Sequence, residues 1–297
     1  MNECINWEKI IPNFQQGDVI TPLATKFERQ RQEDVIIDGG YNHNDLLEGC
    51  AFVKRKGSQK EGVYNQRGEQ ILPEEFDKCE LEIYNSADFY ATAIKVKKDG
   101  VYGLYNDNGQ MIVPIQFIAI YLKDNFIVVQ DKNKLYGAYM HDGRKVLDCE
   151  YDYVEAVGCI DEGLSYVKMS KKGWWGVTLE TGKEVVPILF RRIEEGRSGY
   201  IVYDDFSKKS SRKGWYSWEG KYSIPCLFET IKFDYSRIYV KTPDGLKGIY
   251  SSHDARELVP PKFETINFIG EFFIGLIGND KLSVYDWLGN CLYSTTN

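Results

Sequence analysis

The chain has 297 residues, of which 43% are hydrophobic and 27% charged, and these fractions exclude gross disorder. It carries 37 basic and 44 acidic side chains, so its net charge of −7 argues against a protein that binds the nucleic-acid backbone through a basic stripe. No apolar run approaches the roughly 18 residues that a membrane-spanning helix needs.

Residues 1–45 form an N-terminal segment that differs from the rest of the sequence. Glu3, Glu8 and Asp18 interrupt its apolar residues, and no apolar core of signal-peptide length follows a basic start. We therefore expect a cytoplasmic protein. The seven cysteines are an odd number without paired spacings, which in a reducing compartment predicts free thiols.

From Gly62 onward the sequence repeats itself. Each copy has a glycine, an apolar residue and usually a tyrosine, then a polar turn with a second glycine, an apolar pair and a proline. The seven copies start at Gly62, Gly103, Gly137, Gly176, Gly214, Gly248 and Ser283. Self-similarity at such a period indicates an array of structural repeats, which we place at residues 46–297.

Two positions after the proline predict the core between repeats. Three residues past it stand Phe76, Phe117, Tyr151, Phe190, Phe228 and Phe263. Six residues past it stand Cys79, Ile120, Val154, Ile193, Ile231 and Ile266. Burying each large apolar side chain should contribute roughly 1.5–3 kcal/mol.

Each copy is expected to form a meander of three or four short strands, which makes the predicted fold all-β. The second glycine closes a hairpin turn, as at Asn108-Gly109, because glycine tolerates a positive φ. An apolar pair such as Ile112-Val113 predicts a strand that is covered on both faces. The proline that follows, such as Pro114, is expected to end that strand because it has no N–H for the ladder.

The repeat resembles the WG-repeat family of bacterial proteins. The fourth copy carries the pattern most completely, in Lys171-Lys172-Gly173-Trp174-Trp175-Gly176 followed by Val185-Val186-Pro187 and Phe190. The second and third copies have Tyr102-Gly103 and Tyr136-Gly137 in place of the Trp-Gly pair, and other copies depart further. The resemblance implies a β-repeat module used for binding or scaffolding, and it implies no common catalytic activity.

Two arrangements of the seven repeats fit the sequence. One is a closed seven-bladed propeller, and the alternative is an open β-solenoid or hairpin stack. Residues 17–22 match the second half of a repeat, while the seventh copy stops at its proline position, a pattern that ring closure would produce. In the solenoid, residues 17–22 would instead belong to a degenerate capping repeat, so the N-terminal segment is expected either to close or to cap the array.

A search for catalytic chemistry is negative. The sequence has no phosphate-binding GxxxxGK[ST] loop, no GxSxG nucleophile motif, and no HExxH or CxxC zinc signature. Cys79, Cys149 and Cys226 occupy packing positions of the repeat, so they are interpreted as small buried hydrophobic residues. We expect no enzyme, no cofactor and no metal site.

The candidate functional residues are tryptophans that stand in or beside turns: Trp174, Trp215, Trp218 and Trp287. Exposed tryptophans are frequent anchors of interfaces, although the same rings could cover strand edges or stack between repeats. The favoured hypothesis is a non-enzymatic repeat scaffold that binds an unidentified protein partner through its variable loops. The alternatives are a glycan or cell-envelope binding module and, less favoured, an enzyme with paired carboxylates at a propeller's centre.

Overall fold

The computed structural model describes residues 6–22, 50–86, 89–123, 125–157, 165–206, 211–278 and 280–295. Of the N-terminal segment predicted at residues 1–45, only residues 6–22 are therefore described. Its remaining residues lie outside the described part of the chain. The backbone forms two compact units, Met1–Ser165 and Tyr166–Asn297.

The described chain is all-β and contains seven antiparallel sheets of four strands each, which confirms the predicted fold class. Within the described residues the only helix is α1 (Trp7–Ile10), and no helix is long and apolar enough to cross a membrane. Each sheet is a meander, because its four strands are neighbours both in the sequence and in the hydrogen-bonded order.

The first three sheets begin near the N-terminus and share one strand order, from first to fourth. They consist of β1 (Val19–Pro22), β2 (Cys50–Lys54), β3 (Glu61–Asn65) and β4 (Gln70–Phe76); β5 (Lys78–Ser86), β6 (Phe89–Lys98), β7 (Val101–Asn106) and β8 (Met111–Phe117); and β9 (Ala119–Leu122), β10 (Phe126–Gln130), β11 (Tyr136–Met140) and β12 (Lys145–Tyr151).

The fourth to seventh sheets repeat this plan. They consist of β13 (Tyr153–Val157), β14 (Tyr166–Lys171), β15 (Trp174–Leu179) and β16 (Glu184–Phe190); β17 (Arg192–Gly196), β18 (Gly199–Tyr203), β19 (Lys213–Ser217) and β20 (Ser223–Phe228); β21 (Thr230–Asp234), β22 (Arg237–Lys241), β23 (Lys247–Ser251) and β24 (Glu257–Phe263); and β25 (Thr265–Ile269), β26 (Phe272–Ile277), β27 (Lys281–Asp286) and β28 (Cys291–Ser294).

Residues 19–22, whose match to half a repeat favoured ring closure, form β1 of the first sheet. They pair with β2 in an antiparallel register that runs from Val19↔Lys54 to Pro22↔Ala51. The seventh sheet has a fourth strand of its own, β28, which pairs with β27. The partial match is thus explained within the first sheet, and the propeller and the solenoid both stay predictions.

The proline position does not end a strand, contrary to the prediction. Pro114 lies inside β8, which continues to Phe117. The register steps from Leu104↔Val113 to Tyr102↔Phe117, so β8 bulges between Val113 and Phe117. Because the bulge takes Pro114 out of the ladder on an edge strand, its missing N–H has no hydrogen bond to lose.

The same bulge explains the glycine of the Trp-Gly pair. A Cβ atom on Gly176 in β15 would lie 2.8 Å from the carbonyl oxygen of Val186 and 3.1 Å from the backbone nitrogen of Ile188. These contacts are closer than a side chain tolerates, so the glycine lets β15 approach the bulged strand β16. This glycine is therefore required for strand packing, whereas the second glycine of the repeat is required for a turn.

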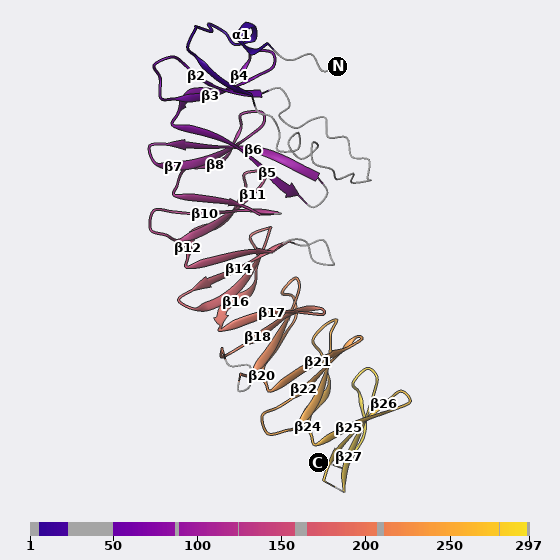
Figure 1. Ribbon diagram of the computed structural model, residues 1–297. Helices are drawn as coiled ribbons and strands as arrows, with labels where there is room; N and C mark the ends of the chain where they lie inside the picture. Colours follow the sequence, from indigo (N-terminus) through magenta and orange to yellow (C-terminus); the bar gives the residue numbers. More distant parts are fainter. Residues whose placement is uncertain are drawn as a thin grey trace, which may run out of the picture. The chain divides into compact units, whose positions relative to one another are not determined.

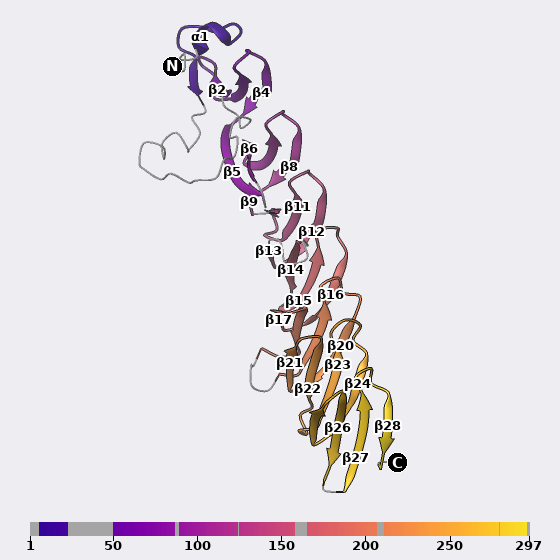
Figure 2. The same cartoon turned by 90° about the vertical axis from the view of Figure 1, so that its right-hand side faces the viewer.

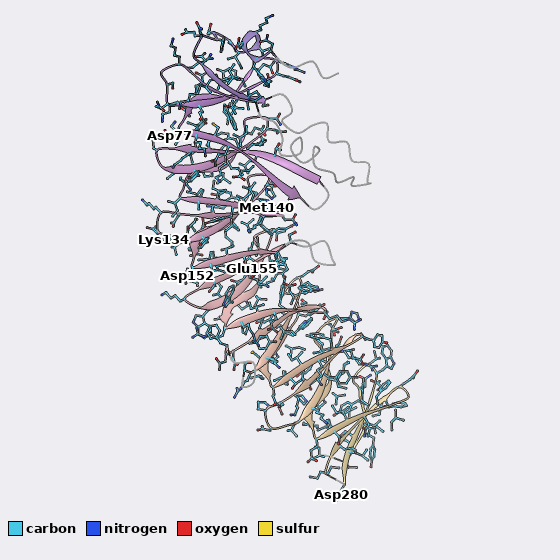
Figure 3. All side chains as sticks on the ribbon, viewed as in Figure 1. Asp77, Lys134, Met140, Asp152, Glu155 and Asp280 are labelled. Carbon is cyan, nitrogen blue, oxygen red and sulfur yellow. The ribbon has the colours of Figure 1, made fainter. Side chains whose placement is uncertain are left out.

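Within each unit, successive sheets pack face to face, and their side chains fill the space between them (Figures 1 and 3). The core between the second and third sheets contains Phe117, which meets Tyr139 edge to face at 6.0 Å. Between the sixth and seventh sheets, Phe263 and Tyr285 repeat this contact at 6.0 Å. The aromatic core position is buried in all six copies, as predicted.

The second glycine of a repeat also sets the contact with the preceding sheet. Gly109 has a φ of +75°, and a Cβ atom there would lie 2.5 Å from the carbonyl oxygen of Ile71 in β4. In the seventh sheet, a Cβ atom on Gly289 would lie 2.8 Å from Cα of Leu258 in β24. In both sheets, the turn before the fourth strand thus lies against the fourth strand of the sheet before it. Figure 2 shows β20, β24 and β28 following one another along one side of the second unit.

Residues 7–11, called here the N-terminal cap, take the place of a preceding sheet for the first sheet. Trp7 and Ile11 are buried together with Ala51, Val53 and Tyr64. The turn of the first sheet likewise lies close to the segment that precedes the sheet, because a Cβ atom on Gly68 would lie 2.4 Å from the carbonyl oxygen of Ile10. The first sheet is therefore covered on this face by residues that do not belong to a repeat.

Candidate interaction surface

The four candidate tryptophans occupy four different environments, and Trp215 corrects the prediction. Trp215 lies within β19 and is fully buried in the core between the fifth and sixth sheets. It fills the apolar position directly after the first glycine, where Leu104 and Ile249 are also fully buried. Trp215 is thus a core residue, because strand β19 points it towards the next sheet, and it cannot anchor a surface.

Trp218 lies in the turn that follows β19 and is half-buried. Its ring meets Tyr200 edge to face at 4.8 Å and lies 6.4 Å from Tyr166 in a tilted arrangement. Both tyrosine side chains are fully buried. Trp218 therefore covers core tyrosines, which is the structural role that the sequence left open for these rings.

Trp174 is the centre of an exposed cluster that the sequence did not reveal as a whole. It begins β15, directly after a turn in which Lys172 and Gly173 both have positive φ. The guanidinium carbon of Arg191 lies 3.5 Å from the centroid of its ring, and the same guanidinium lies 5.6 Å from the ring of Phe206. We call these three residues the Trp174 cluster.

Backbone and side-chain hydrogen bonds hold Arg191 in this position. Its backbone N–H donates to the carbonyl oxygen of Tyr203 at 2.9 Å, which fixes the connection between β16 and β17. Its Nη1 donates to the carbonyl oxygen of Gly173 at 3.4 Å. The guanidinium is thus placed over the Trp174 ring by the turn that precedes the ring.

The Trp174 cluster remains open to solvent. Trp174 is 36% exposed and Phe206 is 59% exposed. A cation over an aromatic face is attracted by the ring quadrupole, by roughly 0.5–1 kcal/mol at an exposed site. The contact therefore orders two large side chains at the surface in advance of any binding, and tryptophan and arginine are the residue types that dominate binding hot spots.

Trp287 is the other exposed tryptophan of the four, with 58% of its surface accessible. It lies in the turn between β27 and β28, which Asp286 closes by accepting hydrogen bonds from the backbone N–H groups of Leu288 and Asn290. A further hydrogen bond from the Asn290 side chain is the main cause that lowers the pKa of Asp286. Among the described residues, the Trp287 ring has no aromatic or cationic neighbour of the kind that Arg191 provides for Trp174.

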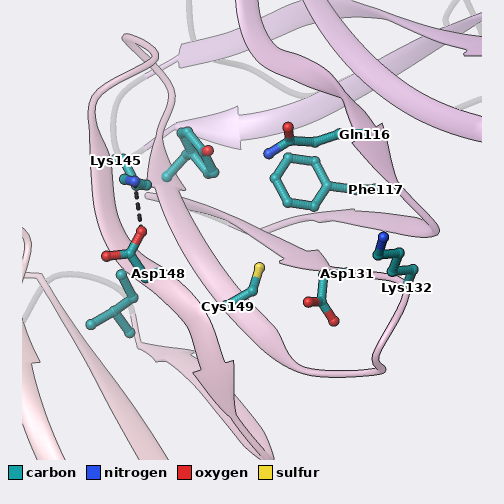
Figure 4. A pocket seen from close by; sticks show the side chains of 9 residues that line it. Gln116, Phe117, Asp131, Lys132, Lys145, Asp148 and Cys149 are labelled. Carbon is teal, nitrogen blue, oxygen red and sulfur yellow. Dashed lines mark hydrogen bonds and ion pairs between the residues drawn. The ribbon is translucent and has the colours of Figure 1, made fainter.

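The first unit contains a cavity of about 370 Å³ between the second and third sheets (Figure 4). Its polar wall includes Lys145 and Asp148, whose Nζ and Oδ1 atoms are 2.6 Å apart, and its lining also includes Asp131 and Cys149. The volume is within the range of small-ligand sites. Burial is the main cause that raises the pKa of the Cys149 thiol to about 11, and nearby Asp131 adds to it.

Four of the described thiols, those of Cys50, Cys79, Cys149 and Cys226, are poor nucleophiles. Burial raises the pKa of Cys79 to about 12 and those of Cys50 and Cys226 to about 11. Only the thiolate form attacks, so at neutral pH these groups are almost entirely inactive. Cys79 is buried at its predicted core position, whereas Cys149 and Cys226 are only partly buried. Over the described ranges, no group of three or more His, Cys, Asp or Glu side chains could hold a metal ion.

Sequence reasoning found Trp174 and Trp287 as surface residues but missed Arg191 and Phe206. Arg191 directly follows the core residue Phe190, and this position varies among the repeats, so nothing in one sequence marked it. Phe206 follows β18 in a connection without repeat pattern. Their contact with Trp174 depends on how the fourth and fifth repeats fold, which the linear spacing did not show.

Comparison with known proteins gives a family match for part of the chain. No curated protein matches the sequence. Similar solved structures include the computationally designed Ika8 protein (13% identity, covering 83% of this chain and 84% of that one, TM-score 0.24), BamB from Moraxella catarrhalis (10%, 84% and 80%, 0.27), and KlHsv2 with loop 6CD replaced by a Gly-Ser linker (13%, 81% and 86%, 0.28). Residues 102–136 and 136–172 match the sequence model of the WG containing repeat, which confirms the predicted family resemblance in two consecutive repeats.

Proposed function

We propose that this WG-repeat chain is a non-enzymatic scaffold that binds a protein partner through the Trp174 cluster. The observation that carries the proposal is the guanidinium of Arg191 held 3.5 Å above the ring of an exposed tryptophan. Ordering these side chains before binding removes part of the entropy cost that association would otherwise pay. Leu189, two residues before Arg191, is 66% exposed and would extend the apolar contact area.

A peptide or protein surface is a better fit to this cluster than a glycan. Sugars bind to tryptophan by stacking on an open ring face, and Arg191 already occupies one face of Trp174. The overall charge of −7 favours a basic or neutral partner over a strongly acidic one. Glycan or cell-envelope binding is the competing proposal, and the same variants test it.

The absence of catalysis and a cytoplasmic location are parts of the same proposal. The raised pKa values of Cys50, Cys79, Cys149 and Cys226 support the first part, because they make these four thiols poor nucleophiles. The second is supported by Cys50, Cys79, Cys149, Cys226 and Cys291, which are free thiols.

Affinity capture with variants tests the proposal. The tagged full chain, Trp174→Ala and Arg191→Ala would be crosslinked in native lysate, and the captured proteins quantified by mass spectrometry. We expect at least one protein that the wild type enriches and that each variant captures about tenfold or more weakly, as at a binding hot spot.

Trp287→Ala is the matched control, because it removes a second exposed tryptophan from the same unit. It should capture the partner as the wild type does. Equal capture by all four proteins, or no enriched protein with the wild type, would contradict the proposal. Loss of binding to a glycan array in Trp174→Ala, without any protein partner, would favour the competing function.

A further inference from the structure

The seventh sheet has one face that packs on the sixth sheet and one that does not. Phe273 and Tyr285 belong to the packed face and are buried against Phe263. Because side chains alternate along a strand, their neighbours point to the opposite side. The register places Ile274 beside Val284, and Val284 beside Tyr293, on that side.

This opposite side, called here the seventh-sheet face, has apolar residues on all four strands. Its apolar residues are Ile269, Phe272, Ile274, Leu276, Leu282, Val284, Leu292 and Tyr293, and the register places the polar residues Thr265, Asn267 and Asp286 on the same side. Tyr293 is 57% exposed and Leu292 is 55% exposed. Exposed apolar patches bordered by polar residues mark interaction sites, so this composition indicates a surface that is covered by a partner.

The corresponding positions of the other repeats show what such a face normally does. In the position of Val284, the other six copies carry Val63, Leu104, Ala138, Val177, Trp215 and Ile249, all of them fully buried. In the position of Tyr293 they carry Leu72, Val113, Leu147, Val186, Ile224 and Val259, all of them buried. The seventh-sheet face thus has the chemistry of a surface that packs against another β-sheet.

The low charge of the seventh-sheet face is compatible with packing against the same face of a second copy. Asp286 is the one residue of this face with a formal charge, although the chain as a whole has a net charge of −7. Asp286, which the register places beside Phe272, is engaged with the turn N–H groups of Leu288 and Asn290. Two copies of this face would therefore bring together one carboxylate from each copy, and each carboxylate is already hydrogen-bonded within its own turn.

A second copy could instead receive the seventh-sheet face on its first sheet, but the apolar face of that sheet is already covered. The first sheet would present Ala51, Val53 and Tyr64, but these lie under Trp7 and Ile11 of the N-terminal cap. A head-to-tail contact, which could continue into a fibre, therefore lacks a free apolar acceptor at the first sheet. A face that pairs with itself closes after two copies.

We propose that the seventh-sheet face binds the same face of a second copy and forms a two-fold symmetric dimer. Four strands about 4.8 Å apart and about 18 Å long cover roughly 350 Å² in projection, which is small for a stable protein interface. The dimer is therefore weak and depends on concentration. This proposal does not rest on the Trp174 cluster, which lies on other strands.

Sedimentation equilibrium of the purified full chain tests the dimer between about 1 and 200 μM, a range suited to a weak interface. The wild type should shift from the 34.3 kDa monomer towards twice that mass and not beyond it. Leu292→Glu and Tyr293→Glu bring a charge from each copy into the contact and should weaken association about 100-fold or more. Both positions are so exposed in the single chain that folding should tolerate the change, which circular dichroism would verify.

Leu189→Glu is the matched control, since it places the same charge at an exposed leucine outside the seventh-sheet face. It should dimerise as the wild type does. The proposal is overturned by a wild type that stays monomeric at 200 μM, by assemblies that grow past two copies, or by a dimer that Leu292→Glu and Tyr293→Glu leave intact.

Discussion

The first and seventh sheets share one strand plan, yet equivalent residues have opposite exposure. Val63 and Leu72 in the first sheet are almost completely buried, whereas Val284 and Tyr293 in the same positions of the seventh sheet are not. On its other face, the first sheet is covered by Trp7 and Ile11, which belong to no repeat. The repeat sequence thus defines a sheet with two apolar faces, and the neighbour decides whether each face is buried.

The largest expected effect is the removal of the N-terminal cap's main side chain. Trp7→Ala should destabilise the first unit by about 3–5 kcal/mol, because it opens a cavity over Ala51, Val53 and Tyr64. Urea unfolding would measure this change in the free energy of unfolding. Trp287→Ala, at an exposed tryptophan, should cost less than about 1 kcal/mol. A similar small loss for both variants would show that the cap does not stabilise the first sheet.

A matched pair of glycines sharpens the same comparison. Gly68 and Gly57 both have φ near +75°, but only at Gly68 would a Cβ atom meet the cap, 2.4 Å from the carbonyl oxygen of Ile10. Gly57→Ala should cost about 1–2 kcal/mol from backbone strain alone. Gly68→Ala should cost at least about 1 kcal/mol more, because the cap must also shift. Equal losses in thermal or urea unfolding would argue against close packing of the cap on this turn.

A polar substitution in one repeat position compares the two sheets directly. Val63→Thr buries a hydroxyl group in the core between the first and second sheets and should cost about 1–3 kcal/mol. Val284→Thr leaves the hydroxyl accessible in the monomer and should cost less than about 1 kcal/mol there. Unfolding at a concentration below dimer formation would measure both. Equal costs would mean that Val284 is as buried in the monomer as Val63.

The smallest expected effect depends on pH and concerns the link between Asp18 and the first sheet. Its carboxylate accepts backbone N–H bonds from Lys56 and Gln15 and pairs with Arg55, and the bond from Lys56 is the main cause that lowers its pKa. A lowered folded-state pKa stabilises the protein above the unfolded value of about 4, and this stability is lost as the pH falls through the lowered pKa.

Asp18→Asn should therefore be less stable than the wild type at pH 7, and the difference should shrink as the pH falls below about 4. Urea unfolding of both proteins at several pH values would measure it. A difference that stays constant down to pH 2.5 would exclude the carboxylate charge as its origin.

Much of the fold could be predicted because its signals are local and repeated. Phe117 and Ile120 were placed in the core from their offsets to Pro114, and both are buried. The prediction that Pro114 ends its strand was wrong, because it did not include the bulge that removes Pro114 from the hydrogen-bonded ladder. A bulge depends on the pairing of two strands, and the sequence of one strand does not show it.

The candidate site could be predicted only in part. Trp174 and Trp215 both follow or flank a glycine near a turn, yet one is a surface residue and the other is fully buried. The two tryptophans are three positions apart in the repeat, and because side chains alternate between the faces, an odd difference puts them on opposite sides and points Trp215 to the next sheet. Arg191 and Phe206 come together with Trp174 only when the fourth and fifth repeats are folded.

The sequence by itself determined the number of repeats, their all-β class and the aromatic core positions, because these depend on periodic patterns of side-chain size and polarity. Only the tertiary structure showed that residues 7–11 cover the first sheet, that Arg191 lies on Trp174, and that the seventh-sheet face is exposed. The physical reason is that burial belongs to a pair of surfaces. A strand sequence specifies an apolar face, and only the folded neighbour, or its absence, decides whether water reaches it.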